Sequence, residues 1–102
     1  MPAEQAVIVK FKYGLDDLDP LFALEEKLEE AIGAANVGEY DGHDIAVDLS
    51  DGGLYMYGTD ADALLAVILP HLRAATFMKG AICTRRYGDV ADPSAKEVKS
   101  LI

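Results

Sequence analysis

The stretch LYMYGTDADALLAVIL, residues 54–69, decides the fold, because its hydrophobic period changes from that of a strand to that of a helix. Its first five residues alternate, so a strand buries either Leu54 and Met56 or the tyrosines Tyr55 and Tyr57. The apolar residues after the glycine recur at helical spacing. The sequence therefore predicts a β-strand that leads directly into a helix.

This helix is predicted over about 60–75. Residues 59–62, Thr-Asp-Ala-Asp, resemble a helix-capping box in which Asp replaces Glu. Pro70 removes one backbone hydrogen bond, so we expect the last turn to be less regular than the rest.

A second strand and helix of the same kind lie upstream. Residues 7–13 predict a strand with Val7, Val9, Phe11 and Tyr13 on its buried face and with Ile8, Lys10 and Lys12 on the other. A helix is predicted over about 20–35, with Asp19 as its N-cap and Pro20 at its first position. Its buried stripe is Leu21, Leu24, Leu28 and Ile32, and its opposite face, with Glu25, Glu26, Glu29 and Glu30, is expected in solvent.

A further strand is predicted at 45–49, where IAVDL alternates after a polar loop at 38–43. The SDGG segment that follows, at 50–53, has the residues of a tight hairpin turn. It would join this strand to the one at the start of the decisive stretch.

The C-terminal part contributes one or two strands. Residues 79–87 predict a strand around Cys83. Residues 89–102 are either a loose tail, a short helix capped by Asp92, or an added edge strand near 97–102, and the edge strand is favoured.

The order β-α-β-β-α-β predicts an α+β fold, a ferredoxin-like two-layer sandwich with an antiparallel sheet and two helices on one face. The chain, 1–102, is expected to form one domain with its core in about 7–88. The first and third strands form the central pair, and one sheet face stays uncovered. The predicted core is Val7, Val9, Phe11, Leu21, Leu24, Leu28, Ile32, Ile45, Val47, Leu64, Ile68 and Leu72.

Three stretches, EYDGHD at 39–44, LYMYGTDADAL at 54–64 and RYG at 86–88, resemble a group of small bacterial proteins of unknown function. The similarity spans about residues 7–100. The resemblance implies the ferredoxin-like fold and a bacterial origin, and it implies no activity and no functional residue.

The formal net charge of the 102-residue chain is −9, and the acidic residues are concentrated in its middle. Residues 16–62 contain fourteen acids and a single base, Lys27. This balance argues against binding to nucleic acid or to an anionic membrane surface, since both require clustered Lys and Arg. It suits a basic protein partner, although acidity can also serve solubility alone.

We expect a soluble cytoplasmic protein. No apolar run approaches the roughly 18 residues that a membrane span needs, and the N-terminus lacks the regions of a secretory signal. The single Cys83 cannot form an internal disulfide, which favours a reducing compartment.

No catalytic signature is present, whether a Gly-rich phosphate loop, paired Cys, His-Glu-x-x-His or a nucleophile elbow, so neither enzyme activity nor a cofactor or metal is expected. The one polar cluster, a weak one, is Asp41, His43 and Asp44, which we interpret as a solvated loop rather than a cation site. His71 and Cys83 are interpreted as structural.

The uncovered sheet face is the more informative candidate site. Its expected residues are Ile8, Lys10, Lys12, Tyr55, Tyr57 and Arg86, with Arg85 as the alternative to Arg86. RNA-recognition domains stack bases on aromatic residues of such a face, but their longer aromatic-glycine motif is missing here and Asp44 adds negative charge.

Tyr and Arg are enriched in protein interfaces, so the leading hypothesis is a non-catalytic protein-interaction module that binds its own copy, as a homodimer, or another protein. One alternative is an acidic inhibitor or immunity-type partner of a basic protein. The other is a small dimeric enzyme or ligand-binding domain that uses His43 or a tyrosine as its acid-base group.

Overall fold

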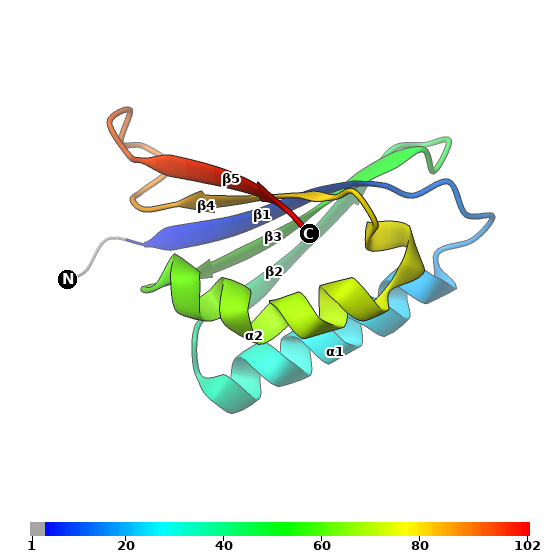
Figure 1. Ribbon diagram of the computed structural model, residues 1–102, viewed down its shortest axis with the longest axis horizontal. Coiled ribbons are helices and arrows are strands. Elements are labelled where there is room, and N and C mark those ends of the chain that lie inside the picture. Colours follow the sequence, from blue (N-terminus) through cyan, green and yellow to red (C-terminus); the bar gives the residue numbers. More distant parts are fainter. Residues whose placement is uncertain (1–3) are drawn as a thin grey trace.

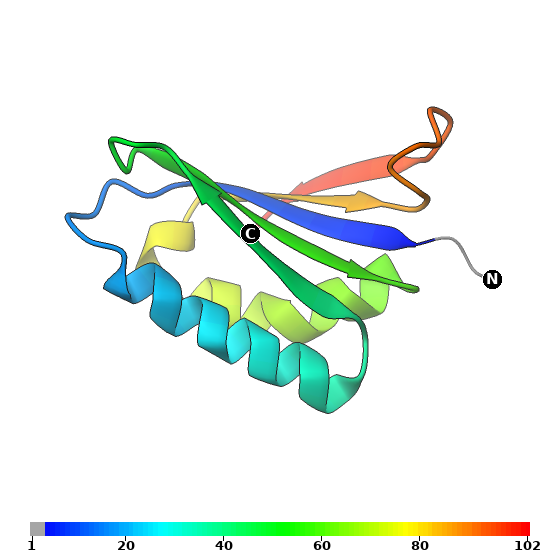
Figure 2. The same ribbon diagram turned by 180° about the vertical axis from the view of Figure 1, so that it is seen from behind.

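The computed structural model describes residues 4–102 as a five-stranded antiparallel sheet with two helices on one of its faces (Figure 1). Along the chain the elements are β1 (Gln5–Lys12), α1 (Asp19–Ala35), β2 (Glu39–Ile45), β3 (Asp51–Gly58), α2 (Ala61–Ala74), the 3-10 turn η1 (Thr76–Met78), β4 (Ile82–Arg86) and β5 (Glu97–Leu101). The strand order is β2-β3-β1-β4-β5, so β1 lies at the centre between β3 and β4. Seen from behind, both helices again lie below the sheet (Figure 2).

The core lies between the sheet and the helices. The register pairs Val7 with Met56 and Val9 with Leu54, and all four side chains are buried on the helix-facing side. The two helices cover them with Leu21, Leu24, Leu28 and Ile32 from α1 and with Ala61, Leu64, Leu65, Ile68 and Leu72 from α2. Of the two alternatives for the strand at 54–58, the leucine and methionine are therefore buried, and the tyrosines lie on the other face.

The predicted helices are confirmed to within a residue or two at each end, but their caps are not the predicted ones. The N-cap of α1 is Leu18, which makes no side-chain cap bond, and Asp19 lies in the first turn. The N-cap of α2 is Asp60, whose carboxylate accepts two backbone N–H bonds from the first turn. Pro70 lies inside α2, and the helix continues to Ala74.

The predicted positions of the second strand and its hairpin turn are wrong. The strand is Glu39–Ile45, where a polar loop was expected, and the turn is formed by the following residues 46–50. In this turn Ala46 N donates to Asp51 O at 2.9 Å, and Leu49 takes a positive φ of 62°. The Asp48 carboxylate accepts hydrogen bonds from both the backbone N–H and the hydroxyl of Ser50. These side-chain bonds stabilise a turn that the alternation of IAVDL does not reveal.

Because the hairpin is shifted from its predicted position, two members of the predicted core are not fully buried. Val47 lies at the tip of the turn and is fully exposed, and Ile45 is only partly buried. Gly52 and Gly53, predicted as turn residues, are buried within β3. A Cβ on Gly52 would lie 2.6 Å from the Phe11 ring, so this glycine allows the ring to pack directly on the backbone of β3.

The favoured prediction of a C-terminal edge strand is confirmed, because β5 pairs antiparallel with β4. Among residues 4–102, α2 contacts β1, β3 and β4, and α1 contacts α2 and β2, but neither helix contacts β5. The edge strand therefore extends beyond the helix layer. Both of its faces are accessible, and Leu101 is 72% exposed.

Candidate functional site

The register defines the side chains of the sheet face opposite the helices, which we call the open face. Its members are Ala6, Ile8, Lys10 and Lys12 of β1, Asp51, Gly53, Tyr55 and Tyr57 of β3, Glu39, Gly42 and Asp44 of β2, Ile82, Thr84 and Arg86 of β4, and Glu97, Lys99 and Leu101 of β5. All six residues predicted for this face lie on it. The structure therefore brings them together as expected.

A short hydrogen-bonded chain crosses β1, β3 and β2 on the open face. Lys10 Nζ donates to the Tyr55 hydroxyl at 2.6 Å, and this hydroxyl donates to Asp44 Oδ2 at 2.7 Å. The bond with Tyr55, opposed by partial burial and helped by the nearby Asp44 carboxylate, raises the pKa of Lys10 above its usual value. The lysine is therefore held in its charged form.

Gly53 has no side chain and so leaves room for these three hydrogen-bonded side chains. A Cβ at this position would lie 2.8 Å from Asp44 Oδ1 and 3.0 Å from both Lys10 Nζ and the Tyr55 hydroxyl. The three polar groups thus converge above a bare stretch of β3 backbone. The sequence did not indicate this role, because Gly-Gly was interpreted as a turn.

Apolar side chains of β1, β4 and β5 lie beside the hydrogen-bonded chain of Lys10, Tyr55 and Asp44. Ile8 is flanked by Tyr55 on β3 and by Thr84 on β4. Ile82, 42% exposed, pairs with Leu101 of β5, and together they form an accessible apolar corner. Sequence reasoning missed this corner because, among the residues of the C-terminal strands, it placed only an arginine on the open face.

The two arginines of β4 point to opposite sides of the sheet. Arg86 lies on the open face, but it is only 8% exposed and its Nε donates to Gly88 O at 2.7 Å. Arg85 lies on the helix side and forms a 2.9 Å ion pair with Asp62 of α2. Arg86 therefore anchors the loop after β4, and little of its guanidinium is accessible to a partner.

The pleat of β2 separates the members of the weak polar cluster, Asp41, His43 and Asp44. His43 faces α1, whereas Asp44 faces the open side, and Asp41 lies in the β-bulge between Tyr40 and Gly42. Within the described range 4–102, no three His, Cys, Asp or Glu side chains lie close enough to hold a metal ion.

A polar contact between α1 and β2 was not predicted. The Tyr40 hydroxyl donates to Glu25 at 2.5 Å, and His43 Nδ1 lies 2.9 Å from the same carboxylate. Burial of Tyr40, followed by its bond with Glu25, strongly raises the pKa of the tyrosine. Glu25, expected on a solvated face, has a side chain that is only 14% exposed, so that prediction is wrong for this residue.

The other two singled-out residues have structural surroundings. Cys83 is buried among core residues, and burial raises the pKa of its thiol, so less of it is present as the reactive thiolate. His71 lies with Lys27 on the wall of a hollow of about 270 Å³ between α1 and the end of α2. The remaining wall of this hollow is mostly apolar, with three alanines, Pro20, Leu24 and Phe77.

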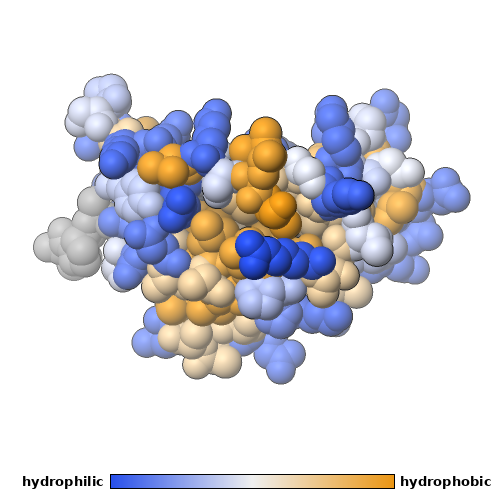
Figure 3. Space-filling view, in the orientation of Figure 1, coloured by the Kyte–Doolittle hydropathy of each residue, from blue (hydrophilic) through white to orange (hydrophobic). Residues whose placement is uncertain are grey.

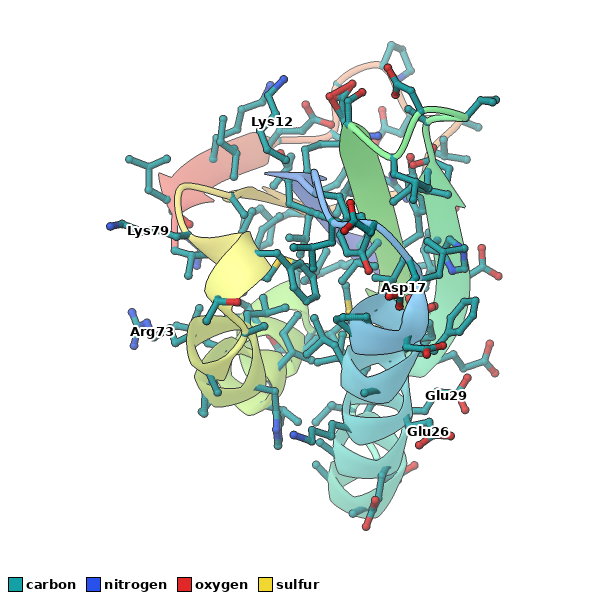
Figure 4. The ribbon with its side chains drawn as sticks, turned by 90° about the vertical axis from the view of Figure 1, so that its right-hand side faces the viewer. Lys12, Asp17, Glu26, Glu29, Arg73 and Lys79 are labelled. Atoms are coloured by element: carbon teal, nitrogen blue, oxygen red, sulfur yellow. The ribbon has the colours of Figure 1, made fainter. Side chains whose placement is uncertain are left out.

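The charges of the helix layer are separated by side. Arg73 and Lys79 lie on the side of α2, and Asp17, Glu26 and Glu29 lie on the side of α1 (Figure 4). Lys12, also labelled there, belongs to the open face, where it pairs with Asp51 of β3. A second hollow, of about 480 Å³, is lined by Arg73, Lys79 and Ile102 among others. Figure 3 shows an apolar area around the end of β5, crossed by hydrophilic atoms.

A comparison of the chain with protein-family models, with curated proteins and with solved structures found no match. The resemblance to small bacterial proteins therefore stays an expectation from the sequence. Within the part of the chain that the structure describes, neither helix is long and apolar enough to cross a membrane.

Proposed function

We propose that this chain is a non-catalytic protein-interaction module that binds its partner through the open face. We also propose that its β1-to-β4 part is a ferredoxin-like unit, βαββαβ, to which β5 is added as an edge strand. The observation that carries the functional proposal is the group Ile8, Tyr55, Ile82 and Leu101, which places apolar and aromatic surface on a face that no described element covers.

An uncovered face of an antiparallel sheet is usually polar. Here, a tyrosine with a fixed hydroxyl and three aliphatic side chains lie among charged residues. Tyr is favoured in interface cores because it contributes a large contact area at a low cost in conformational entropy. Tyr55 is already immobilised by Lys10 and Asp44, so binding would order little that is not ordered in the free protein.

One alternative has its own support. Exposed acids of α1, among them Glu26 and Glu29, lie on one side of the molecule and suit a basic protein (Figure 4). An inhibitor that works through this side would bind independently of the open face, and its affinity would fall strongly with added salt.

The enzyme alternative has less support. His43 pairs with Glu25 on the helix side, so β2 separates it from Tyr55 on the open face. No acid-base pair on the open face includes a histidine among the residues that the structure describes.

The proposal is tested by affinity capture with the immobilised protein. We expect Tyr55→Ala combined with Tyr57→Ala to remove the specifically captured proteins, because both rings lie on the open face. Phe22→Ala is the matched control, since Phe22 is an aromatic residue on α1 that is 47% exposed. Captured proteins that are lost with Phe22→Ala and kept with the tyrosine variant would contradict the proposal.

A further inference from the structure

We infer that the partner of the open face is a second copy of this chain, stacked face to face about a twofold axis. This inference rests on the proposed function and names the partner of the same site. It is carried by the charges of the open face, by the two edges of the sheet and by the size of the face.

The open face is balanced in charge, in contrast to the whole molecule. It carries four cations and four acids, namely Lys10, Lys12, Arg86, Lys99 and Glu39, Asp44, Asp51, Glu97, with Asp41 at its edge in the bulge. The formal net charge of the chain is −9. Nearly all of the excess negative charge therefore lies elsewhere, and two copies can approach through the open face with the least mutual repulsion.

The balanced face is also complementary to itself. Three of its four acids lie on β2 and β3, the fourth, Glu97, lies on β5, and its four cations lie on β1, β4 and β5. A twofold axis that runs parallel to the strands, between β1 and β3, places the acidic strands β2 and β3 of one copy over the cationic strands β4 and β1 of the other. Each such contact then occurs twice, as an isologous interface requires.

Neither edge of the sheet suits strand-to-strand association. At one edge, β5 has Lys99 at its centre, so two antiparallel β5 strands centred on this residue would bring the two lysines together. At the other edge, β2 contains the bulge at Tyr40 and Gly42 and carries exposed acids. A central lysine, a bulge and like charges are the features by which edge strands avoid pairing. The open face is therefore the part of the sheet that is available for association of two copies.

The size of the face agrees with a stable dimer. The strands are spaced about 4.8 Å apart and have 8, 7, 8, 5 and 5 residues from β1 to β5, so at about 3.3 Å per residue their projected area is roughly 500 Å². Standard interfaces bury about 800 Å² of accessible surface per partner, and accessible surface exceeds projected area because side chains roughen the face.

The experiment is analytical ultracentrifugation from about 1 μM to about 1 mM, a range that covers tight and weak dimers. We expect the wild type to reach twice its monomer mass of 11.0 kDa and no more. A monomer throughout this range overturns the second-copy inference. Growth to larger species also overturns it, because association of the acidic α1 side with the cationic α2 side would be head-to-tail and would not close.

Two charge-reversed proteins test the face independently of the register of the dimer. One carries Lys10→Glu, Lys12→Glu and Lys99→Glu, and the other carries Asp44→Lys, Asp51→Lys and Glu97→Lys, all at exposed positions. Alone, each is expected to dimerise at least about tenfold more weakly, since like charges then face each other. Mixed in equal amounts, they should form a heterodimer at least as tight as the wild type.

The matched control reverses three exposed cations off the face, Lys27→Glu, Arg73→Glu and Lys79→Glu. It has the same net charge as the lysine-reversed protein, so retained dimerisation shows that position rather than total charge matters. Loss of the dimer in this control, or its retention in both face variants, overturns the inference.

Circular dichroism checks that each variant is folded. If a triple variant is unfolded, Leu101→Glu on the open face replaces it, with Val47→Glu at the exposed hairpin tip as its control. The dimer should weaken only with Leu101→Glu, and equal effects of the two changes overturn the inference.

The two proposals can fail separately. If the wild type is a monomer but still captures another protein through Tyr55 and Tyr57, only the inference of a second copy is overturned. If it is a monomer and captures no protein through these tyrosines, the proposed function is overturned as well.

Discussion

Lys10 contacts Tyr55 in two ways, because its ammonium group donates to the hydroxyl at 2.6 Å and lies 4.9 Å from the centre of the ring. The two residues come from neighbouring strands that meet only in the folded sheet. Asp44 accepts from the same hydroxyl on its other side. This arrangement fixes one aromatic ring at the centre of the open face.

We predict that Tyr55→Phe lowers the pKa of Lys10 toward its ordinary value. The hydrogen bond with Tyr55 is the largest cause of the raised pKa, and the substitution removes this bond while keeping a ring at the position. NMR titration of the Lys10 side chain measures the change. Tyr57→Phe is the control and should leave the Lys10 titration unchanged, since Tyr57 pairs with Ala6 and not with Lys10. An unaltered Lys10 titration in Tyr55→Phe would show that the bond is absent in solution.

We predict that Leu28→Ala and Ile68→Ala each lower the free energy of unfolding by about 2 to 5 kcal/mol, because both side chains are fully buried between the helices and the sheet. Urea denaturation followed by circular dichroism measures the loss. Val47→Ala, at the fully exposed hairpin tip, is the control and should change stability by no more than about 0.5 kcal/mol. A larger effect at Val47 than at Leu28 would favour the strand that the sequence alone predicted.

The helices and the central strands were predictable from the sequence because their apolar residues repeat over many positions. The stripes of α1 and α2 extend over several turns, and the alternation of β1 fixes which of its faces is buried. The same alternation placed Ile8, Lys10 and Lys12 on the open face, and the register then brought Tyr55 beside them. This part of the candidate site follows directly from period-two alternation.

The hairpin between β2 and β3 was not predictable in the same way. IAVDL alternates as a strand should, but the Asp48 carboxylate and the left-handed Leu49 form a turn within it. The pair Gly52 and Gly53 has the composition of a turn, yet each glycine serves a close contact within β3. The placement of the glycines depends on tertiary neighbours, Phe11 for Gly52 and Asp44 for Gly53, which local sequence does not show.

We predict that Gly52→Ala destabilises the protein by about 1 to 3 kcal/mol. A methyl group at this position would meet the Phe11 ring at 2.6 Å, and the ring has little room to move within the core. Thermal unfolding measures the change. Gly33→Ala is the matched control, because Gly33 lies in α1 with open space around it, and there alanine should add up to about 1 kcal/mol through its higher helix propensity. Stabilisation by Gly52→Ala would show that Phe11 does not cover this glycine.

The last prediction concerns Tyr40, whose hydroxyl donates to Glu25 at the contact between α1 and β2. Burial and this bond raise the pKa of Tyr40 far above its ordinary value of 10.0. Above pH 10 the unfolded chain therefore loses a proton that the folded chain keeps, and the free energy of unfolding falls as the pH rises.

We predict that Tyr40→Phe makes this alkaline loss of stability shallower, because phenylalanine has no proton to lose. The loss should not disappear, since burial also raises the pKa of Tyr13. Near pH 8 the same variant should be less stable than the wild type by about 1 kcal/mol, the usual contribution of one hydrogen bond. Urea midpoints measured between pH 8 and pH 11 test both effects, with Tyr57→Phe as the control on the open face. Equal alkaline slopes for the wild type and Tyr40→Phe would mean that Tyr40 ionises alike in the folded and unfolded chains, and that its contact with Glu25 does not form in solution.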